Sequence, residues 1–383
     1  MSVTEAGGFR ASGVTAGLKP SGRPDVALVV NDGPSSAAAA VYTSNRCKAN
    51  PVLWSETASA DGVVRAVVLN SGGANCYTGA QGFSVTHASA ELVGRLLDAS
   101  PGDVVVCSTG LIGQPLDRPL LESGIEAAAQ ALAADGGGAA ATAIMTTDTV
   151  SKQGVQHGDG WVVGGMAKGA GMLAPALATM LVVLTTDADV DAAQCDVALR
   201  AATRVTFDRL DSDGCQSTND TVLLMASGAS GVRPDQASFT AAVSALCHDL
   251  AQQLMRDAEG ADHDISIDVV RAASEDDAVE VARSVARSNL FKAAVFGRDP
   301  NWGRVLAAVG TTSAAFDPSV LDVAMNGVWI ARDGGPAEDR DGVDLTGRDL
   351  HVLIDLKEGD ATATVWTNDL THAYVHENSA YST

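Results

Sequence analysis

The chain has 383 residues, of which 25 are Lys or Arg and 47 are Asp or Glu, so its formal net charge at pH 7 is −22. This length suits two domain-sized units, and so strong a negative charge argues against nucleic acid or an anionic membrane as a partner. The six cysteines form no Cys-x-x-Cys pair, so neither a zinc site nor a disulfide framework is indicated. The sequence predicts no leader and no membrane span, and we expect a cytoplasmic protein.

Strands and helices alternate in the first half of the chain. A strand is predicted over 63–70, where it ends in a Ser-Gly-Gly turn, and a helix over 84–97. A second strand is predicted over 104–107 and a second helix over 120–134. The triple glycine at 136–138 is expected to break that helix.

The second half continues the mixture of strands and helices. Bulky apolar and β-branched residues predict a buried strand over 180–184. Apolar residues at helical spacing then predict one long helix over 237–258, which Gly260 ends. A strand at 265–270 and a helix that Ser274 caps and that reaches about residue 288 follow. Because both halves mix the two element types, we expect an α/β (α+β) sandwich.

One candidate site follows the strand at 104–107. The next residues, Ser108-Thr109-Gly110, predict a sharp turn whose backbone N–H groups point outward. Such a turn suits an anion or the oxyanion of an acyl-transfer intermediate. The alternative is a plain connection from a strand to a loop, which the same residue types also build.

The most informative segment runs from Lys168 to Leu181 and reads Lys-Gly-Ala-Gly-Met-Leu-Ala-Pro-Ala-Leu-Ala-Thr-Met-Leu. It leads from glycines to Thr179, immediately before the predicted buried strand. If the chain were cut between Ala178 and Thr179, the threonine would carry a free α-amine, with a pKa of roughly 8, beside its hydroxyl. Hydroxyl and amine would then be nucleophile and base. By β-propensity alone, Thr179 is the ordinary first residue of a strand.

The same segment formally matches a relaxed dinucleotide-binding fingerprint at Gly169, Gly171 and Ala174. A dinucleotide loop opens a helix, whereas Pro175 and the predicted strand at 180–184 indicate an extended segment. We therefore do not expect a nucleotide at this position.

The segment from Lys168 to Leu181 resembles the self-cleavage signature of the ornithine acetyltransferases. In that family a Lys-Gly-x-Gly-Met run leads into Ala-Thr-Met-Leu, and the chain is cut before the threonine. Further blocks typical of the family occur in order along nearly the whole chain. They are Leu69-Asn70-Ser71-Gly72-Gly73-Ala74-Asn75, Ser108-Thr109-Gly110-Leu111-Ile112-Gly113, Met145-Thr146-Thr147-Asp148, Ser217-Thr218-Asn219-Asp220, Ala258-Glu259-Gly260, Asp299-Pro300-Asn301-Trp302-Gly303-Arg304 and Glu377-Asn378-Ser379-Ala380-Tyr381.

The resemblance implies an ornithine acetyltransferase/DmpA-like sandwich made of two chains. Self-cleavage would give an α chain, residues 1–178, with the oxyanion hole, and a β chain, residues 179–383, that begins with the nucleophile. The two chains would be intertwined rather than separable, and they would assemble as a heterotetramer or larger. Neither a metal nor an organic cofactor is implied.

The family's functional positions can be transferred one by one. The resemblance implies Thr179 as the nucleophile and the Thr109 hydroxyl and Gly110 N–H as the oxyanion hole. Lys168 suits a substrate carboxylate and Glu259 a substrate ammonium. Where the family usually has a Thr-Lys pair after Glu259-Gly260, this chain has Asp262-His263, which removes a basic side chain. The implied substrate-binding residues are Thr146 (with Thr147 as the near alternative), Lys168, Thr179, Glu259, Asn378 and Thr383.

The activity implied by the resemblance is that of a glutamate N-acetyltransferase in arginine biosynthesis. Thr179 would take the acetyl group from N-acetylornithine and pass it to glutamate by a ping-pong mechanism. The sequence leaves open whether acetyl-CoA is also a donor. The alternative enzyme is an amidohydrolase or aminopeptidase with the same threonine, in which water resolves the acyl-enzyme. A third alternative, a non-enzymatic binding protein, predicts a single uncut chain.

Overall fold

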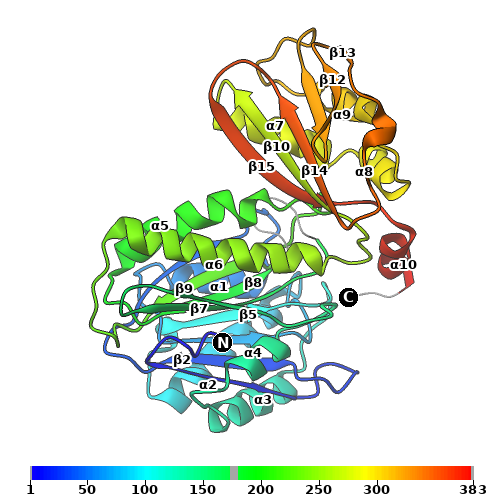
Figure 1. Ribbon diagram of the computed structural model, residues 1–383. Helices are drawn as coiled ribbons and strands as arrows, with labels where there is room; N and C mark the ends of the chain where they lie inside the picture. Colours follow the sequence, from blue (N-terminus) through cyan, green and yellow to red (C-terminus); the bar gives the residue numbers. More distant parts are fainter. Residues whose placement is uncertain (1, 173–179, 381–383) are drawn as a thin grey trace.

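The structure is a computed structural model that describes residues 2–172 and 180–380. Two lobes follow each other along the chain (Figure 1). The first lobe extends to the long helix α6 (Gln236–Arg256), and the second begins with strand β10 (Asp264–Ala272). Three predicted site residues lie outside the described residues, namely Ala178, Thr179 and Thr383.

Two β-sheets form the middle of the first lobe. Their strand orders are β1-β2-β4-β5 and β3-β9-β8-β7-β6. Because successive side chains of a strand point to opposite faces, Leu181 and Val183 of β8 share one buried cluster with Val67 and Leu69 of β4, between the sheets. The strands are β1 (Phe9–Val14), β2 (Val26–Asn31), β4 (Ala66–Asn70) and β5 (Val104–Ser108) in one sheet, and β3 (Ala37–Tyr42), β9 (Thr221–Ala226), β8 (Leu181–Thr186), β7 (Val162–Lys168) and β6 (Lys152–His157) in the other.

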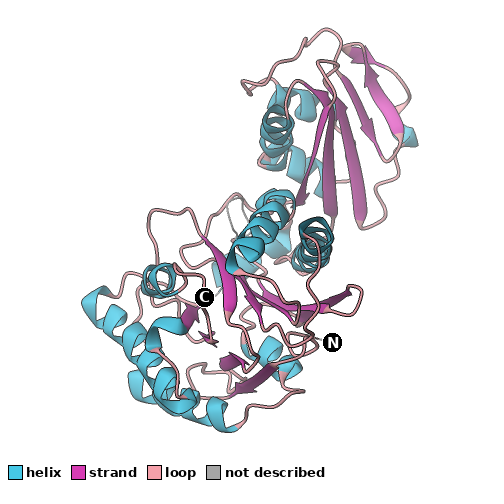
Figure 2. Cartoon of the chain, turned by 90° about the vertical axis from the view of Figure 1, so that its left-hand side faces the viewer, coloured by secondary structure: helices cyan, strands magenta, loops and turns pink. Residues whose placement is uncertain are grey.

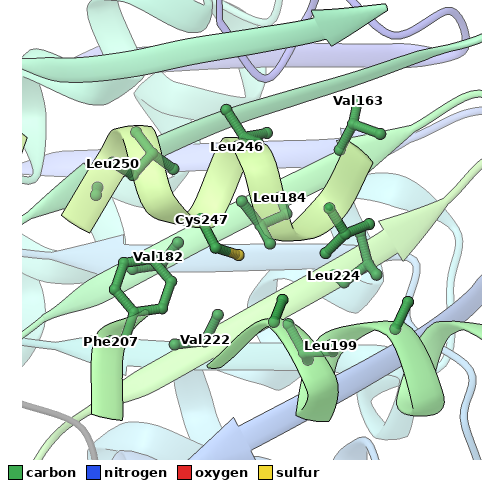
Figure 3. Close-up of a cluster of buried hydrophobic side chains, with 14 of the residues drawn as sticks. Val163, Val182, Leu184, Leu199, Phe207, Val222, Leu224, Leu246, Cys247 and Leu250 are labelled. Atoms are coloured by element: carbon green, nitrogen blue, oxygen red, sulfur yellow. The ribbon is translucent and has the colours of Figure 1, made fainter. Parts of the chain in front are cut away.

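Helices cover the outer face of each sheet (Figures 1 and 2). Val182 and Leu184, the alternate residues of β8, pack in a second cluster with Leu199 of α5 and Leu246 of α6 (Figure 3). The first lobe is therefore a four-layer sandwich of helices, sheet, sheet and helices. Its helices are α1 (Asn50–Ala58), α2 (Gly79–Leu97), α3 (Arg118–Gln130), α4 (Gly137–Ala143), α5 (Ala192–Val205) and α6.

The second lobe is one sheet with helices packed against it. Its strand order is β13-β12-β11-β14-β10-β15, and Ile265, Ile267 and Val269 of β10 pack in a buried cluster with residues of α7, α8 and α9. The remaining elements are α7 (Glu275–Ala286), α8 (Asn289–Phe296), α9 (Trp302–Val309), β11 (Asp322–Met325), β12 (Val328–Arg332), β13 (Gly335–Pro336), β14 (Asp349–Asp355), β15 (Ala361–Asn368) and α10 (His372–Ala380).

The structure confirms the mixed α/β sandwich and the type of each predicted element. The Ser274 side chain accepts the N–H of Asp277 and so caps α7, as the sequence predicts. The prediction that the glycines at 136–138 act as a helix breaker is wrong, because Gly137 begins helix α4. The small residues there fit against neighbouring backbone: a Cβ on Gly136 would come within 1.8 Å of the Ala11 carbonyl oxygen.

The strands before and after the predicted cut between residues 178 and 179 belong to the same sheet. Strands β8 and β9 follow that position in the sequence, yet they lie between β3 and β7, which precede it. The two stretches of chain therefore share backbone hydrogen bonds from β3 to β9 and from β7 to β8. Within the described residues, no helix is both long and apolar enough to cross a membrane.

Candidate active site

The site begins where two parallel strands end at the same edge of their sheet. β4 and β5 pair in parallel, with Asn70 opposite Ser108, so the loops that follow them leave side by side. The Asn70 side-chain amide donates a hydrogen bond of 2.6 Å to the Ser108 hydroxyl, and the Thr109 N–H donates to the Asn70 carbonyl at 3.0 Å. Strand pairing thus fixes the start of the Thr109-Gly110 turn.

Gly110 occupies a position that only glycine fits. Its φ is +128°, and a Cβ there would come within 2.9 Å of the backbone nitrogen of Gly73. Within residues 2–172 and 180–380, the Gly110 N–H donates no hydrogen bond. A backbone N–H that is held in place but unpaired is the kind of donor that an oxyanion requires.

Asn219 joins the two loops to the second sheet. It precedes β9, and its side-chain amide donates to the carbonyl oxygens of Ala74 and Ser108 at 2.7 and 2.8 Å. The Thr218 hydroxyl donates to the Asn219 side-chain oxygen at 2.6 Å and so orients that amide. Blocks far apart in the sequence, at 69–75, 108–113 and 217–220, therefore meet at one place.

Lys168 reaches the same turn from the other sheet. It is the last residue of β7 and is 1% exposed, and its Nζ donates to the Thr109 hydroxyl oxygen at 3.3 Å. Burial lowers the pKa of Lys168, and the carboxylate of Asp148 acts in the opposite direction. The structure therefore brings the predicted residues Thr109, Gly110 and Lys168 together.

Asp148 and Lys152 form a buried network behind Lys168. The Asp148 carboxylate accepts the N–H groups of Gly169 at 2.7 Å and of Thr146 at 2.9 Å, so it ties together two predicted substrate-binding segments. Lys152 bridges Asp148 and Asp257, with both distances 2.6 Å. Burial by itself raises the pKa of Asp148, but Lys168 and Lys152 outweigh it and bring that pKa to about 2.

Asp220 lies next to the predicted cleavage position. It is fully buried at the start of β9 and accepts the backbone N–H of Met180 at 3.1 Å. Burial raises the pKa of Asp220 well above its usual range. This carboxyl group thus holds Met180, the first described residue after the predicted cleavage position.

Glu259 lies beyond the end of α6 and contacts the glycine segment that follows Lys168. Its N–H donates to the Ala170 carbonyl at 3.0 Å, and its carboxylate packs on Gly171, where a Cβ would come within 2.6 Å of Oε2. The Asn378 side-chain amide donates to Glu259 Oε2 at 3.0 Å. Two further predicted binding residues are therefore in direct contact.

Helix α10 brings Asn378 to this position. A Cβ on Gly260 would come within 2.2 Å of the Tyr374 nitrogen, and the Thr371 hydroxyl donates to the Gly260 carbonyl at 2.5 Å. The segment up to Ala380 is therefore a docked helix rather than the polar tail that its composition suggests.

His263 is buried, so the departure from the family pattern at 262–263 has a structural role. Its Nδ1 lies 2.7 Å from the Asp369 carboxylate, which also accepts the N–H groups of Asp262 and His263. This contact joins the segment after Glu259 to the segment that leads into α10.

The dinucleotide alternative is wrong. β7 and β8 pair in antiparallel fashion, with Lys168 opposite Leu181, so the intervening segment is not the crossover of a βαβ unit. Within the described residues, no group of three or more His, Cys, Asp or Glu side chains is arranged to hold a metal ion.

Sequence reasoning missed the network behind the site. Asp148 belongs to a recognised block but received no role, and Lys152 and Asn219 likewise received none. Their positions at or beside strands β6 and β9 were not predicted, so the sequence offered no signal that these polar side chains are buried and need partners. Thr146 lies at the edge of the network, where its backbone N–H donates to Asp148, and within the described part of the chain Thr147 makes no such bond.

The Thr109 hydroxyl and the Lys168 ammonium are buried side by side, next to the Gly110 N–H, which has no partner among the described residues. On a four-layer sandwich, this arrangement is that of an enzyme of acyl transfer. The ArgJ family model matches residues 10–383, and the chain belongs to the ArgJ family. It is 63% identical over 382 residues to the "Arginine biosynthesis bifunctional protein ArgJ" of Streptomyces coelicolor and 64% identical over 382 residues to that of Streptomyces avermitilis, with 100% of each chain covered.

Among solved structures, the ornithine acetyltransferase of Mycobacterium tuberculosis, complexed with ornithine, is 50% identical in sequence. That match covers 47% of this chain and 96% of the solved chain, with a TM-score of 0.45.

Proposed function

We propose that this chain is a glutamate N-acetyltransferase of arginine biosynthesis that transfers acetyl from N-acetylornithine to glutamate. Family membership and the names of the full-length relatives support this activity. The observation in the site that carries it is the contact of Lys168 with Thr109, next to the Gly110 N–H, for which residues 2–172 and 180–380 offer no acceptor.

The chain first cleaves itself before Thr179. The threonine hydroxyl attacks the Ala178 carbonyl, the peptide bond rearranges to an ester, and water hydrolyses that ester, which releases the α-amine of Thr179. The bond between Asp220 and the Met180 N–H supports this step, because it fixes the chain immediately after the nucleophile.

Acetyl transfer then uses the same hydroxyl. Thr179 attacks the acetyl carbonyl of N-acetylornithine, and the Thr109 hydroxyl and Gly110 N–H stabilise the oxyanion. Ornithine leaves, and the glutamate amine attacks the acetyl-threonine. Lys168 suits the substrate carboxylate, and Glu259 with Asn378 suits the ornithine ammonium. Thr146 and Thr383 complete the proposed binding set.

The two fragments should remain associated after cleavage. Because β8 and β9 lie between β3 and β7, the fragments 1–178 and 179–383 stay joined through one sheet after cleavage. We propose that two or more copies of each fragment associate, as a heterotetramer or larger. Whether acetyl-CoA is a second donor is tested by supplying it in place of N-acetylornithine.

Intact mass under denaturing conditions tests the proposal first. Two fragments, of 178 residues and the remaining 205 of the 383, are expected, and Thr179→Ala should give one full-length chain. Incubation with N-acetylornithine alone should then add one acetyl group to the larger fragment. Release of free acetate without N-acetylglutamate, when both substrates are present, would identify an amidohydrolase instead.

A further inference from the structure

A separate pocket, with a volume of about 410 Å³, lies beside the proposed acyl-transfer site. It shares Thr146 with that site, and its other lining residues include Lys19 and Arg23. None of its lining residues is acidic, although Asp and Glu outnumber Lys and Arg by 47 to 25 in the chain. A pocket of this size, whose charged lining residues are Lys19 and Arg23, suits a small ligand that carries a negative charge.

Lys19 is held in this pocket by a loop that hydrogen bonds to Asp25 stabilise. The fully buried Asp25 carboxylate accepts the backbone N–H groups of Ala16, Gly17 and Lys19 at 2.6, 3.1 and 3.0 Å. The Lys19 ammonium donates to the carbonyl of Met145 at 2.6 Å and to that of Pro24 at 3.0 Å. These two bonds leave one of its three N–H donors for another partner, immediately beside Thr146.

Three positive charges, those of Lys19, Arg23 and Lys168, lie close to one another around the pocket. The pKa of Lys19 is lowered to about 8, chiefly by burial; Lys168 and Arg23 act in the same direction, and Asp25 and Asp148 act against it. Within the part of the chain that the structure describes, the Arg23 side chain makes no hydrogen bond or ion pair. Cations that are close enough to repel one another are stabilised when an anion binds between them.

The proposed reaction needs a cationic position for the side-chain carboxylate of glutamate. The donor's side chain ends in an ammonium group, for which the carboxylate of Glu259 is suited. The acceptor, glutamate, ends in a carboxylate, which Glu259 would repel. Both substrates occupy the site in turn, so the second carboxylate of the acceptor requires a cationic position away from Glu259.

We propose that Lys19 and Arg23 form the subsite for the side-chain carboxylate of the acceptor amino acid. This inference rests on the proposed function, because it takes the acceptor to be a dicarboxylic amino acid. The loop that holds Lys19 and Arg23 would then select the acceptor, and Glu259, which contacts the glycine segment after Lys168, would select the donor.

The test compares Arg23→Gln with Arg95→Gln. Both residues are exposed arginines, and both changes alter net charge equally, but Arg95 belongs to α2 on the outer helix layer. Steady-state kinetics should give a KM for glutamate that rises about fivefold in Arg23→Gln, the scale of one exposed ion pair, and more in Arg23→Glu. The KM for N-acetylornithine should change by less than about twofold, and Arg95→Gln should match the wild type.

Other outcomes would overturn the assignment. Equal rises in KM for both amino-acid substrates, or no rise for glutamate, would show that the pocket does not select the acceptor. A rise confined to acetyl-CoA as donor would assign the pocket to phosphate groups instead. Acetylation of the wild-type protein by N-acetylornithine is measured separately by mass, so failure of the proposed function is distinguishable from failure of the subsite.

Discussion

The Lys168 ammonium and the Thr109 hydroxyl, 59 positions apart in the sequence, lie 3.3 Å from each other in a buried site. Lys168 ends a strand of one sheet and Thr109 follows a strand of the other, so the contact depends on how the two sheets pack. The ammonium polarises the hydroxyl, which strengthens it as a hydrogen-bond donor to a developing negative charge.

Removal of the Thr109 hydroxyl should therefore slow acetyl transfer. Thr109→Val keeps the shape of the side chain, and we expect kcat to fall by about 10² to 10³ with little change in KM. Thr109→Ser retains the hydroxyl and should keep most of the activity. Rates are to be measured on the cleaved fraction, because the same donor would also serve cleavage. A kcat within about twofold of the wild type in Thr109→Val would remove this hydroxyl from the oxyanion hole.

Substitution of Gly110 should destabilise the protein by two separate effects. Gly110→Ala places a Cβ at a positive φ and 2.9 Å from the Gly73 nitrogen, and should lower the free energy of unfolding by at least about 2 kcal/mol. Gly113→Ala is the matched control, because its φ is +83° but nothing lies within 4 Å of its Cβ. The control should lose about 1 kcal/mol, from backbone strain alone. The free energies of unfolding of both variants, measured in urea, separate the effect of the steric collision with Gly73 from that of the strained backbone.

Loss of the Asp148 charge should leave the buried Lys168 without its main counter-ion and the buried Lys152 with Asp257 alone. We expect Asp148→Asn to lower the free energy of unfolding by about 3 to 5 kcal/mol at pH 6. Asp276→Asn, which removes an exposed carboxylate, should change it by no more than about 0.5 kcal/mol.

The free energy of unfolding should depend on pH through the ionisation of Asp148. The pKa of Asp148 is about 2 in the folded protein and 3.8 without these contacts, so its stabilising effect is complete above about pH 4 and is lost as the pH falls toward 2. The difference in unfolding free energy between wild type and Asp148→Asn should therefore narrow on acidification below pH 4. A constant difference from pH 5 to pH 3 would contradict the low pKa.

Replacement of Glu259 by glutamine should weaken recognition of the donor's side chain. Glu259→Gln keeps an oxygen for Asn378 but removes the charge, so kcat/KM for N-acetylornithine should fall about tenfold. N-acetylnorvaline lacks the side-chain ammonium, and wild type and variant should use it equally. An equal loss with both donors would mean that Glu259 acts on the fold of the site rather than on the ammonium.

Much of the fold was accessible from local sequence patterns. Apolar spacing predicted α6 and β10, and the Ser274 cap predicted the start of α7, because these signals involve residues only a few positions apart. The glycines at 136–138 misled because glycine serves close packing as well as helix breaks: a Cβ on Gly136 would collide with the Ala11 carbonyl, and one on Gly137 with the Ser2 side chain. Helix α10 was likewise not predicted, and it packs closely against Gly260, more than a hundred positions away in the sequence.

The sequence by itself determined the segment from Lys168 to Leu181, the order of the family blocks and, through them, the family. Only the tertiary structure decided that Asp148 joins Thr146 to Gly169, that Asn219 holds the two loops together, and that Lys19 lies beside Thr146. The physical reason is that a sequence pattern reports the neighbours along a strand or helix. Hydrogen bonds and charges between distant segments depend on the packing of whole sheets, which no single segment encodes.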